Sequence, residues 1–441
     1  MSEDFIELPL VASTDSLATM TVMDDETQIR RSVLPGGATV LTQMIPAQRS
    51  VSLSAWCPVG SRHEPEQYAG ATHFLEHLLF KGTRSRSAQQ IANAFDAVGG
   101  ESNAGTTKEF TYYWARVLQE DLPMAVSVLG DMVTSSVIDP EEFERERTVI
   151  HDEIAMGNDD GGSVVHENFA RAVFGASPLG RPIGGTVESV NAASRQDVWQ
   201  YYQERYTSER IVFVAAGAVE HDQLCALVNA ALQDGGWSTD PQRVPTRPTG
   251  VDTHIDYQAR ELVRRKEGEQ AHVIVGGRGL ACNDDRRSVM SVLLAILGGS
   301  MSSRLFQEVR EKRGLAYSTY AFDSSYVDAG LFGLYAGCAP GNVEAVEDLM
   351  RSQLEDLAAA GPTEEEMVRV QGQLRGALAL GLEDSSARMV RLGRAELVHG
   401  RFRPVDRVLR RLQEVQPGQV SELAQYLLEQ PWCRSRVLPP Q

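Results

Sequence analysis

The chain has 441 residues, of which 42% are hydrophobic and 23% are charged, so we expect a globular protein with two or more domains. The formal net charge of −18 disfavours nucleic acid or an anionic membrane surface as the main partner, because both would be repelled. No apolar run approaches the roughly 18 residues needed to cross a bilayer. The N-terminus Met1-Ser2-Glu3-Asp4 is acidic, where a signal peptide would be basic. We therefore expect a cytoplasmic protein.

The first half of the chain alternates between strand and helix patterns. Residues 1–28 have no clear apolar period and are expected to form a loose N-terminal tail. Strands are predicted at 51–56, 110–115 and 211–216, and helices at 122–134 and 224–232. Residues 29–237 are therefore expected to form a sheet covered by helices.

The segment His73-Phe74-Leu75-Glu76-His77 predicts half of a zinc site. At about 100° per residue on a helix, His73, Glu76 and His77 fall within one narrow sector. Two imidazoles at positions i and i+4 can bind one Zn²⁺, and the carboxylate between them can reach a water at the ion without being a ligand. The order His-x-x-Glu-His is the inverse of the common zinc-protease motif.

A second helix supplies candidates for the third zinc ligand that such a site requires. It is predicted to begin at Asp139 as N-cap, with Glu142 completing a capping box. Farther along, Glu146, Ile150 and Glu153 share one face at i, i+4 and i+7. The apolar residues around Ile150 indicate a substantially buried helix, and a buried carboxylate needs a cation or a hydrogen-bond donor.

The two halves of the chain are expected to be homologous. Residues 238–252 lie in a segment dense in Gly and Pro without an apolar period, which predicts a linker. Across it, Asp139-Pro140-Glu141-Glu142 resembles Thr363-Glu364-Glu365-Glu366, and further residues repeat at nearly the same offset. We therefore expect an internal duplication of the α+β class, with two sheet-plus-helix halves at 29–237 and 253–435.

The second half keeps the expected scaffold and lacks the metal motif. Strands are predicted at 273–275 and 331–335, and helices at 343–357 and 420–428. The positions equivalent to the metal motif fall near Leu297, Ser300 and Met301, none of which could replace the metal-binding set. This half is expected to contribute walls or substrate contacts.

The motif from His73 to Thr83, followed by Glu146-Arg-Thr-Val-Ile-His-Asp-Glu153, resembles the pitrilysin and insulinase group of zinc peptidases. Within that group the chain is most similar to the shorter branch, which includes the catalytic β-subunit of mitochondrial processing peptidase and its bacterial relatives. The resemblance covers roughly residues 30–435, and its motifs are highly specific in combination.

The resemblance implies a role for each residue of the two motifs. One Zn²⁺ per chain is expected to be held by His73, His77 and Glu153. Glu76 is expected to be the general base, and Glu146 a supporting acid that orients the site.

The resemblance also implies two substrate contacts. Asn103-Ala104 matches the edge strand on which a substrate backbone pairs by strand addition, although the Gly-rich surroundings alone favour a turn leading into the strand at Phe110. Arg310 and Tyr317 match an Arg and Tyr pair that contacts substrate near the scissile bond. Without the resemblance, Arg310 would be interpreted as an exposed helix residue and Tyr317 as core.

The expected function is zinc-dependent hydrolysis of peptides or unfolded segments by an endopeptidase. Resembling proteins with two homologous halves pair to enclose a chamber, which implies a homodimer, or a heterodimer with a homologous chain. Two alternatives are a noncatalytic core or scaffold subunit and a protease that trims leader segments from a dedicated precursor. The complete metal motif favours an enzyme, and it does not distinguish general degradation from leader trimming.

Overall fold

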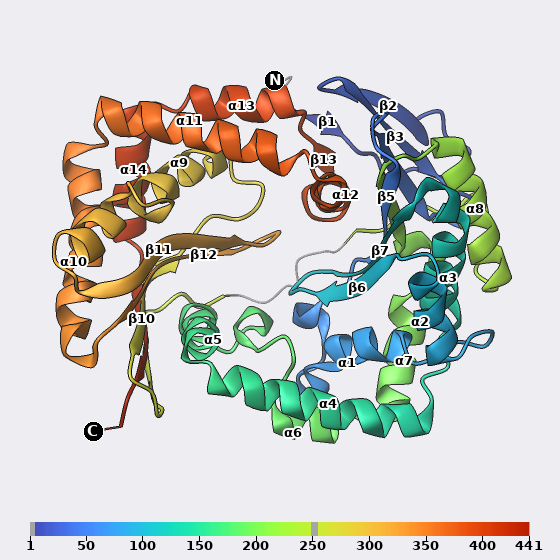
Figure 1. The fold of residues 1–441 in the computed structure, drawn as a ribbon, viewed down its shortest axis with the longest axis horizontal. Coiled ribbons are helices and arrows are strands. Elements are labelled where there is room, and N and C mark those ends of the chain that lie inside the picture. The colour runs from blue at the N-terminus through green and yellow to red at the C-terminus, as the bar shows by residue number, and fades with distance from the viewer. Residues whose placement is uncertain (1–4, 248–254, 441) are drawn as a thin grey trace. The chain divides into compact units, whose positions relative to one another are not determined.

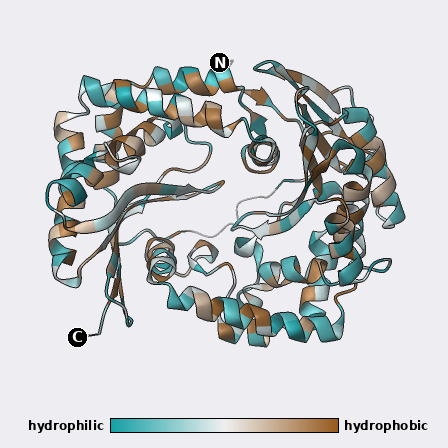
Figure 2. Cartoon of the chain, viewed as in Figure 1, coloured by the Kyte–Doolittle hydropathy of each residue, from teal (hydrophilic) through white to brown (hydrophobic). Residues whose placement is uncertain are grey.

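The computed structural model describes residues 5–247 and 255–440, and the chain forms two compact units. Unit 1 consists of Met1–Asp152, Pro182–Thr249 and Leu380–Arg407, and unit 2 consists of Glu153–Arg181, Gly250–Ala379 and Val408–Gln441. Each unit contains one large sheet with helices packed on it (Figure 1), which confirms the expected α+β class. Hydrophilic and hydrophobic residues alternate around the helices of both units (Figure 2), as expected when one face of each helix is buried.

Unit 1 contains a seven-stranded sheet in the order β2-β3-β4-β8-β5-β7-β6. Its strands are β2 Thr19–Asp24, β3 Thr27–Val33, β4 Thr39–Met44, β5 Ser50–Cys57, β6 Glu101–Thr106, β7 Thr111–Leu118 and β8 Val212–Gly217. The strands predicted at 51–56, 110–115 and 211–216 are present as β5, β7 and β8. β8 is parallel to β4 and antiparallel to β5, and it is buried along its whole length.

The edge strand β6 corrects one sequence-based interpretation. β6 pairs antiparallel with β7, with Asn103 opposite Trp114 and Ala104 opposite Tyr113. The Gly-rich composition had favoured a turn here, and the turn instead follows at Thr107, whose N–H donates to the carbonyl of Phe110. The low strand propensity of these residues is overridden by pairing with β7.

Residues 1–28 are not all a tail, since β2 lies within them. β2 pairs with β3, and its last residue, Asp24, is fully buried. Asp24 accepts hydrogen bonds from the Arg391 guanidinium at 2.5 Å and the Val405 N–H at 2.7 Å. The remaining residues of β2 are exposed or half-buried, which explains why no apolar period is visible in the sequence.

The helices of unit 1 lie on both faces of its sheet. They include α1 Ala71–Leu79, α2 Ala88–Asp96, α3 Leu122–Ser135, α6 Val187–Ala192, α7 Arg195–Arg205, α8 His221–Asp234 and α12 Ser385–Arg394. The helices predicted at 122–134 and 224–232 are present as α3 and α8, which pack together. On β5, Ser52 and Trp56 face α12: Ser52 Oγ lies 2.8 Å from Ser385 Oγ, and Gly393 packs directly on the Trp56 ring. A side chain at Gly393 would clash with that ring.

Unit 2 contains a five-stranded sheet in the order β11-β12-β10-β14-β9. Its strands are β9 Glu261–Arg265, β10 Ala271–Arg278, β11 Ala316–Ser325, β12 Gly330–Cys338 and β14 Trp432–Leu438. The helices packed with them include α5 Gly161–Phe174, α9 Arg287–Gly298, α10 Val343–Ala360, α11 Glu364–Gly381 and α14 Pro417–Leu428. The elements predicted at 273–275, 331–335, 343–357 and 420–428 are all present.

The two compact units do not coincide with the two halves of the sequence, because each unit contains a helix from the other half. Helix α5 of the first half packs on β10 and β14 in unit 2, and α12 of the second half packs on β5 and β8 in unit 1. The halves 29–237 and 253–435 therefore remain a prediction about homology, and they are not the compact units. Residues 248–252 of the predicted linker lie outside the described residues. Within the described ranges, no helix is both long and apolar enough to span a membrane.

Candidate metal centre

Helix α1, which carries the His-x-x-Glu-His motif, begins at a buried carboxylate. Gly70 precedes the helix with φ of 103°, and a Cβ there would lie 2.7 Å from the carbonyl oxygen of Gly184. Glu64 accepts hydrogen bonds from the N–H groups of Gly70 at 2.7 Å and Thr72 at 2.6 Å. A carboxylate at a helix N-terminus also interacts favourably with the helix dipole. Glu64 and Gly70 therefore fix where α1 starts.

The apolar face of α1 determines the direction in which the motif points. The buried residues of the helix include Phe74, Leu75, Leu78 and Leu79, whereas His73, Glu76 and His77 are half-buried. Phe74 stacks on Phe143 of helix α4 (Pro140–Asp159), with ring centroids 4.4 Å apart. This contact packs α4 against α1 and sets which α4 residues can approach the imidazoles.

The start of α4 agrees with its predicted N-cap and differs in the capping box. Asp139 Oδ1 accepts hydrogen bonds from the N–H groups of Glu141 at 2.8 Å and Glu142 at 3.1 Å. The Glu142 carboxylate pairs with Arg145 on the same helix and does not close the box. The charged partner one turn on competes for this side chain.

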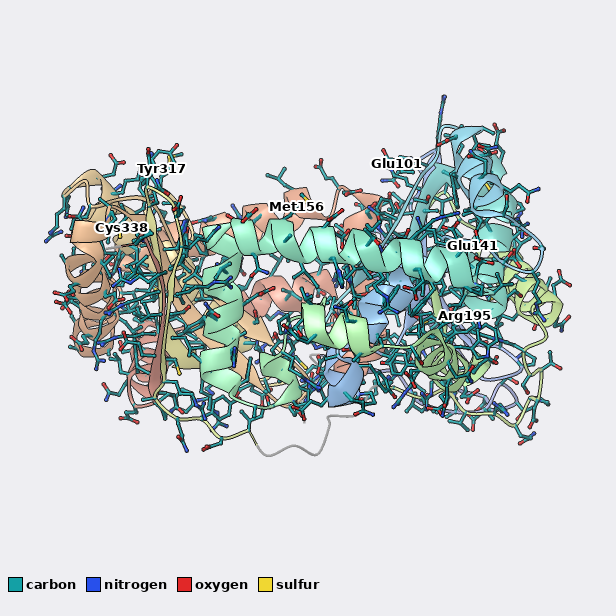
Figure 3. All side chains as sticks on the ribbon, turned by 90° about the horizontal axis from the view of Figure 1, so that it is seen from below. Glu101, Glu141, Met156, Arg195, Tyr317 and Cys338 are labelled. Atoms are coloured by element: carbon teal, nitrogen blue, oxygen red, sulfur yellow. The ribbon has the colours of Figure 1, made fainter. Side chains whose placement is uncertain are left out.

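The burial of α4 is narrower than the sequence predicted. Phe143, Glu146 and Ile150 are its buried residues, whereas Val149 is 41% exposed and Glu153 is exposed. Figure 3 shows α4 as one unbroken helix through the labelled Glu141 and Met156. A surface helix buries a single stripe, so apolar neighbours of Ile150 do not imply burial all round.

The structure brings His73, His77 and Glu153 together. Each offers one ligand atom, and these atoms lie within 4.8 Å of one another. The boundary between the compact units falls between Asp152 and Glu153, inside the continuous helix α4, so the position of Glu153 follows from the helix that packs on α1. Two imidazoles and one carboxylate form a donor set typical of catalytic zinc sites, which leave one position for water or substrate.

The protonation of His73 suits metal binding. Burial, reinforced by the nearby His77, lowers the pKa of His73 to about 4. His73 is therefore neutral at physiological pH, and a neutral imidazole is the form that binds metal ions.

Glu146 contacts the other imidazole of the motif. Its Oε2 lies 3.0 Å from His77 Nδ1, and its Oε1 lies 2.7 Å from Lys81 Nζ. A carboxylate bonded to Nδ1 favours the tautomer with its proton on Nδ1, which leaves Nε2 available for a metal ion. The residues present therefore fit a zinc ion, with the Glu146 carboxylate in contact with Nδ1 of His77.

Glu76 is bonded to the edge strand. The hydroxyl of Thr106, the last residue of β6, donates to Glu76 Oε2 at 2.5 Å. The sequence assigns no role to Thr106 or Lys81, although Lys81 lies within the motif from His73 to Thr83 and Thr106 lies on the same strand as Asn103 and Ala104. The sequence pattern gives only a weak signal for Thr106 and Lys81, because neither residue type is a metal ligand in such sites.

The structure also places the four predicted substrate-contact residues. The Ala104 N–H donates to Asn103 Oδ1 at 2.8 Å on edge strand β6. In unit 2, the Arg310 guanidinium carbon lies 5.0 Å from the Tyr317 ring centroid. Tyr317 is 73% exposed, so its interpretation as core is wrong (Figure 3). The reason is that β11, which carries it, is an edge strand.

Comparisons with known proteins agree with this geometry. Residues 39–187 match the insulinase family, peptidase family M16, and residues 192–374 match the peptidase M16 inactive domain. The chain is 48% identical over 401 residues to an uncharacterized zinc protease of Streptomyces coelicolor, covering 91% of this chain and 87% of that one. It is 35% identical over 411 residues to an uncharacterized zinc protease of Bacillus subtilis, covering 93% and 98%.

A solved structure has the same fold. The crystal structure of a protease from Helicobacter pylori aligns with a TM-score of 0.85 and 19% identity, covering 94% of this chain and 100% of that one. Fold, site and relatives together define a zinc metalloprotease. The chain belongs to the insulinase family, peptidase family M16, which confirms the resemblance seen in the sequence.

Proposed function

We propose that this metalloprotease is an endopeptidase that hydrolyses peptides or unfolded polypeptide segments, with Glu76 as general base. The observation that carries the proposal is that Glu76 lies between His73 and His77 on α1, the helix whose two imidazoles meet the carboxylate of Glu153. When bound there, zinc would acidify a water molecule and polarise the scissile carbonyl.

The residues around the centre have complementary roles in this proposal. Glu76 accepts a proton from the attacking water and returns it to the departing amine. The hydrogen bond from Thr106 to Oε2 orients the Glu76 carboxylate. Glu146 and Lys81 hold His77 in the tautomer that binds metal.

The substrate is proposed to bind as an additional strand on β6. β6 is an edge strand, and an extended peptide can pair with such an edge at Asn103 and Ala104. Because Thr106 ends β6 and bonds to Glu76, a peptide on this edge would run toward the general base. Arg310 and Tyr317 are proposed to contact the substrate near the scissile bond.

The substitution Glu76→Gln tests the proposal. It keeps the size of the side chain and removes the base, so we expect retained zinc and peptide hydrolysis reduced by about 10²-fold or more. Cleavage sites in a peptide library, mapped by mass spectrometry, would be compared between wild type and variant with zinc measured in both. Equal hydrolysis by the two proteins would rule out Glu76 as the base.

The same library addresses the alternatives. A protease dedicated to one leader segment would cleave few or no library peptides, whereas a general endopeptidase would cleave many. A noncatalytic scaffold would show no hydrolysis above that of Glu76→Gln. The scaffold alternative has the least support, because His73, Glu76, His77 and Glu153 are all present.

A further inference from the structure

A cavity of about 430 Å³ lies in unit 1 between the end of α3, helix α7 and the turn after α8. We call it the Arg84 cavity, after the arginine on its rim. Its volume falls within the range of sites that bind small molecules. None of its lining residues belongs to the metal centre.

Four aromatic residues form much of its wall. They are Trp199, Tyr202, Tyr206 and Trp237. The Tyr202 ring lies 5.8 Å from the Trp199 ring and 5.3 Å from the Tyr206 ring. The hydroxyls of both tyrosines are already bonded, to the carbonyl of Val133 and to the Tyr113 hydroxyl. Tyr202 and Tyr206 are nearly fully buried and support the wall, so the apolar surface open to a ligand comes from Trp199 and Trp237. Such surface suits a planar aromatic group.

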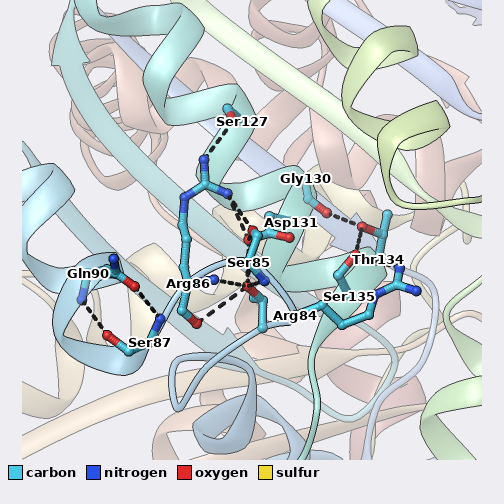
Figure 4. A network of polar contacts seen from close by, with 11 residues as sticks. Arg84, Ser85, Arg86, Ser87, Gln90, Ser127, Gly130, Asp131, Thr134 and Ser135 are labelled. Atoms are coloured by element: carbon cyan, nitrogen blue, oxygen red, sulfur yellow. Dashed lines mark hydrogen bonds and ion pairs between the residues drawn. The ribbon is translucent and has the colours of Figure 1, made fainter.

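Arg84 is the one charged residue among those that line the cavity. Its Nη2 donates to Ser135 Oγ (both residues are labelled in Figure 4) and to the carbonyl of Gly235, both at 3.0 Å, and both acceptors are neutral. The nearby Arg86 differs, because its Nη1 lies 2.7 Å from the carboxylate of Asp131. No carboxylate pairs with Arg84 in the part of the chain that the structure describes. Its charge therefore favours an anionic ligand.

A buried hydroxyl also lines the cavity. Ser136 is 3% exposed, and its Oγ has no hydrogen-bond partner among the described residues. Leaving a buried hydroxyl unbonded is unfavourable, so such groups usually have a partner. Ser136 lines the cavity, and a rotation of its side chain would bring the otherwise inaccessible Oγ to a ligand oxygen there.

We propose that the Arg84 cavity is a second binding site, for a planar aromatic ring that carries a carboxylate. The ring packs against the aromatic wall, and the carboxylate accepts hydrogen bonds from the remaining N–H groups of Arg84 and from Ser136 Oγ. Two sources share this chemistry: a free aromatic acid and the aromatic C-terminal residue of a peptide.

Calorimetric titration of the zinc-loaded Glu76→Gln protein tests the proposal without hydrolysis of the probes. The probes are N-acetyl-L-phenylalanine, its amide, and the peptide Gly-Gly-Gly-Phe with a free or amidated C-terminus. We expect saturable binding of the free carboxylates, with each amide weaker by about tenfold or more because the charged hydrogen bonds are lost. Tighter binding of the peptide than of the acetylated amino acid would identify a peptide C-terminus as the ligand, and the reverse a free acid.

Variants locate the binding in this cavity. Arg84→Gln is expected to weaken binding of the carboxylates about tenfold, and Ser136→Ala, which keeps the buried volume, to weaken it several-fold. Arg145→Gln, which removes an exposed arginine elsewhere in unit 1, is the matched control and should bind as Glu76→Gln alone. Thermal unfolding checks that each variant is folded.

Three results would overturn the proposal: equal affinity for acid and amide, unchanged affinity in both Arg84→Gln and Ser136→Ala, or no saturable binding at millimolar probe. An equal loss of binding in the Glu76→Gln/Arg145→Gln and Glu76→Gln/Arg84→Gln proteins would also contradict the proposal, because a general effect of charge would then be responsible.

Discussion

Two carboxylates on α4 differ in surroundings, and this difference separates their expected roles. Glu146 is buried and bonded to His77 and Lys81, whereas Glu153 is exposed and offers an oxygen next to both imidazoles. Water solvates an exposed carboxylate well, so such a group does not require a protein partner. The approach of Glu153 to two imidazoles is therefore better explained by a cation that all three bind than by burial.

We therefore expect Glu153→Gln to weaken zinc binding more than Glu146→Gln does. Loss of a supporting carboxylate typically costs about 10–100-fold in metal affinity, and loss of a direct ligand should exceed that. Zinc affinity would be measured by competition with a chromophoric chelator. Glu144→Gln, an exposed position on the same helix, serves as control. Normal turnover with full zinc occupancy in Glu153→Gln would remove it from the ligand set.

His221 provides a test of the pH dependence of stability away from the metal centre. Burial lowers its pKa to about 4, with the Arg30 charge contributing. Its Nε2 lies 2.9 Å from Ser32 Oγ and its Nδ1 lies 2.8 Å from Thr42 Oγ1, which suits the neutral ring. Between about pH 6.5 and 4 the unfolded chain binds a proton at this residue that the folded chain does not.

The stability contributed by neutral His221 is therefore complete above about pH 6.5 and is lost as the pH falls toward 4. His221→Gln removes this proton-linked term, so its free energy of unfolding should fall less steeply over that interval than that of wild type. Urea unfolding of the metal-free proteins at several pH values measures both slopes. Identical slopes would show that His221 does not titrate as its burial implies.

At the scale of single elements, we expect the metal-binding role of α1 to depend on its capping by Glu64. Glu64→Gln removes a charge at the helix N-terminus and one of the oxygens that accept from Gly70 and Thr72. We expect unfolding to become easier by about 1–3 kcal/mol and zinc affinity to fall, because α1 positions both imidazoles. Glu66→Gln, at a neighbouring exposed residue, is the control. A Glu64 variant with unchanged stability and zinc affinity would contradict this role.

The elements also differ in how well the sequence predicts them. β5, β8, α3 and α10 were predictable, since each carries a long apolar run or a clear helical period. The local pattern missed β2 and β6, because exposed edge strands bury few residues and β6 is rich in Gly, Ser and Asn. For β6, the family resemblance had implied an edge strand at Asn103-Ala104. Their pairing with β3 and β7 is a long-range contact that a local pattern does not contain.

For the whole molecule, we expect a dimer in which the second half of one chain completes the site of the other. The motivation is that this chain carries both the metal motif and the Arg310 and Tyr317 pair. Glu76→Gln and Arg310→Ala proteins, each weakly active alone, would be mixed under conditions that allow subunit exchange. The mixture should regain about a quarter of wild-type activity. About half of the dimers are then mixed, and one of the two sites in each mixed dimer is intact.

Sedimentation of the same samples gives the oligomeric state. An active monomer, or a dimer whose mixture regains no activity, would show that each site is completed within one chain. If the protein instead forms a heterodimer with a different homologous chain, the wild type would reach full activity only when that chain is added.

The sequence by itself determined the metal motif, the start of α4 and the family, because these depend on short spacings along single helices. Only the tertiary structure decided that Glu153 approaches the imidazoles while Glu146 bonds to Nδ1 of His77, and that α5 and α12 exchange between the compact units. Those outcomes follow from packing between residues far apart in the chain, such as Phe74 on Phe143 and Trp56 on Gly393. Helical periodicity limits which residues share a face, and the partner of that face is chosen by the fold.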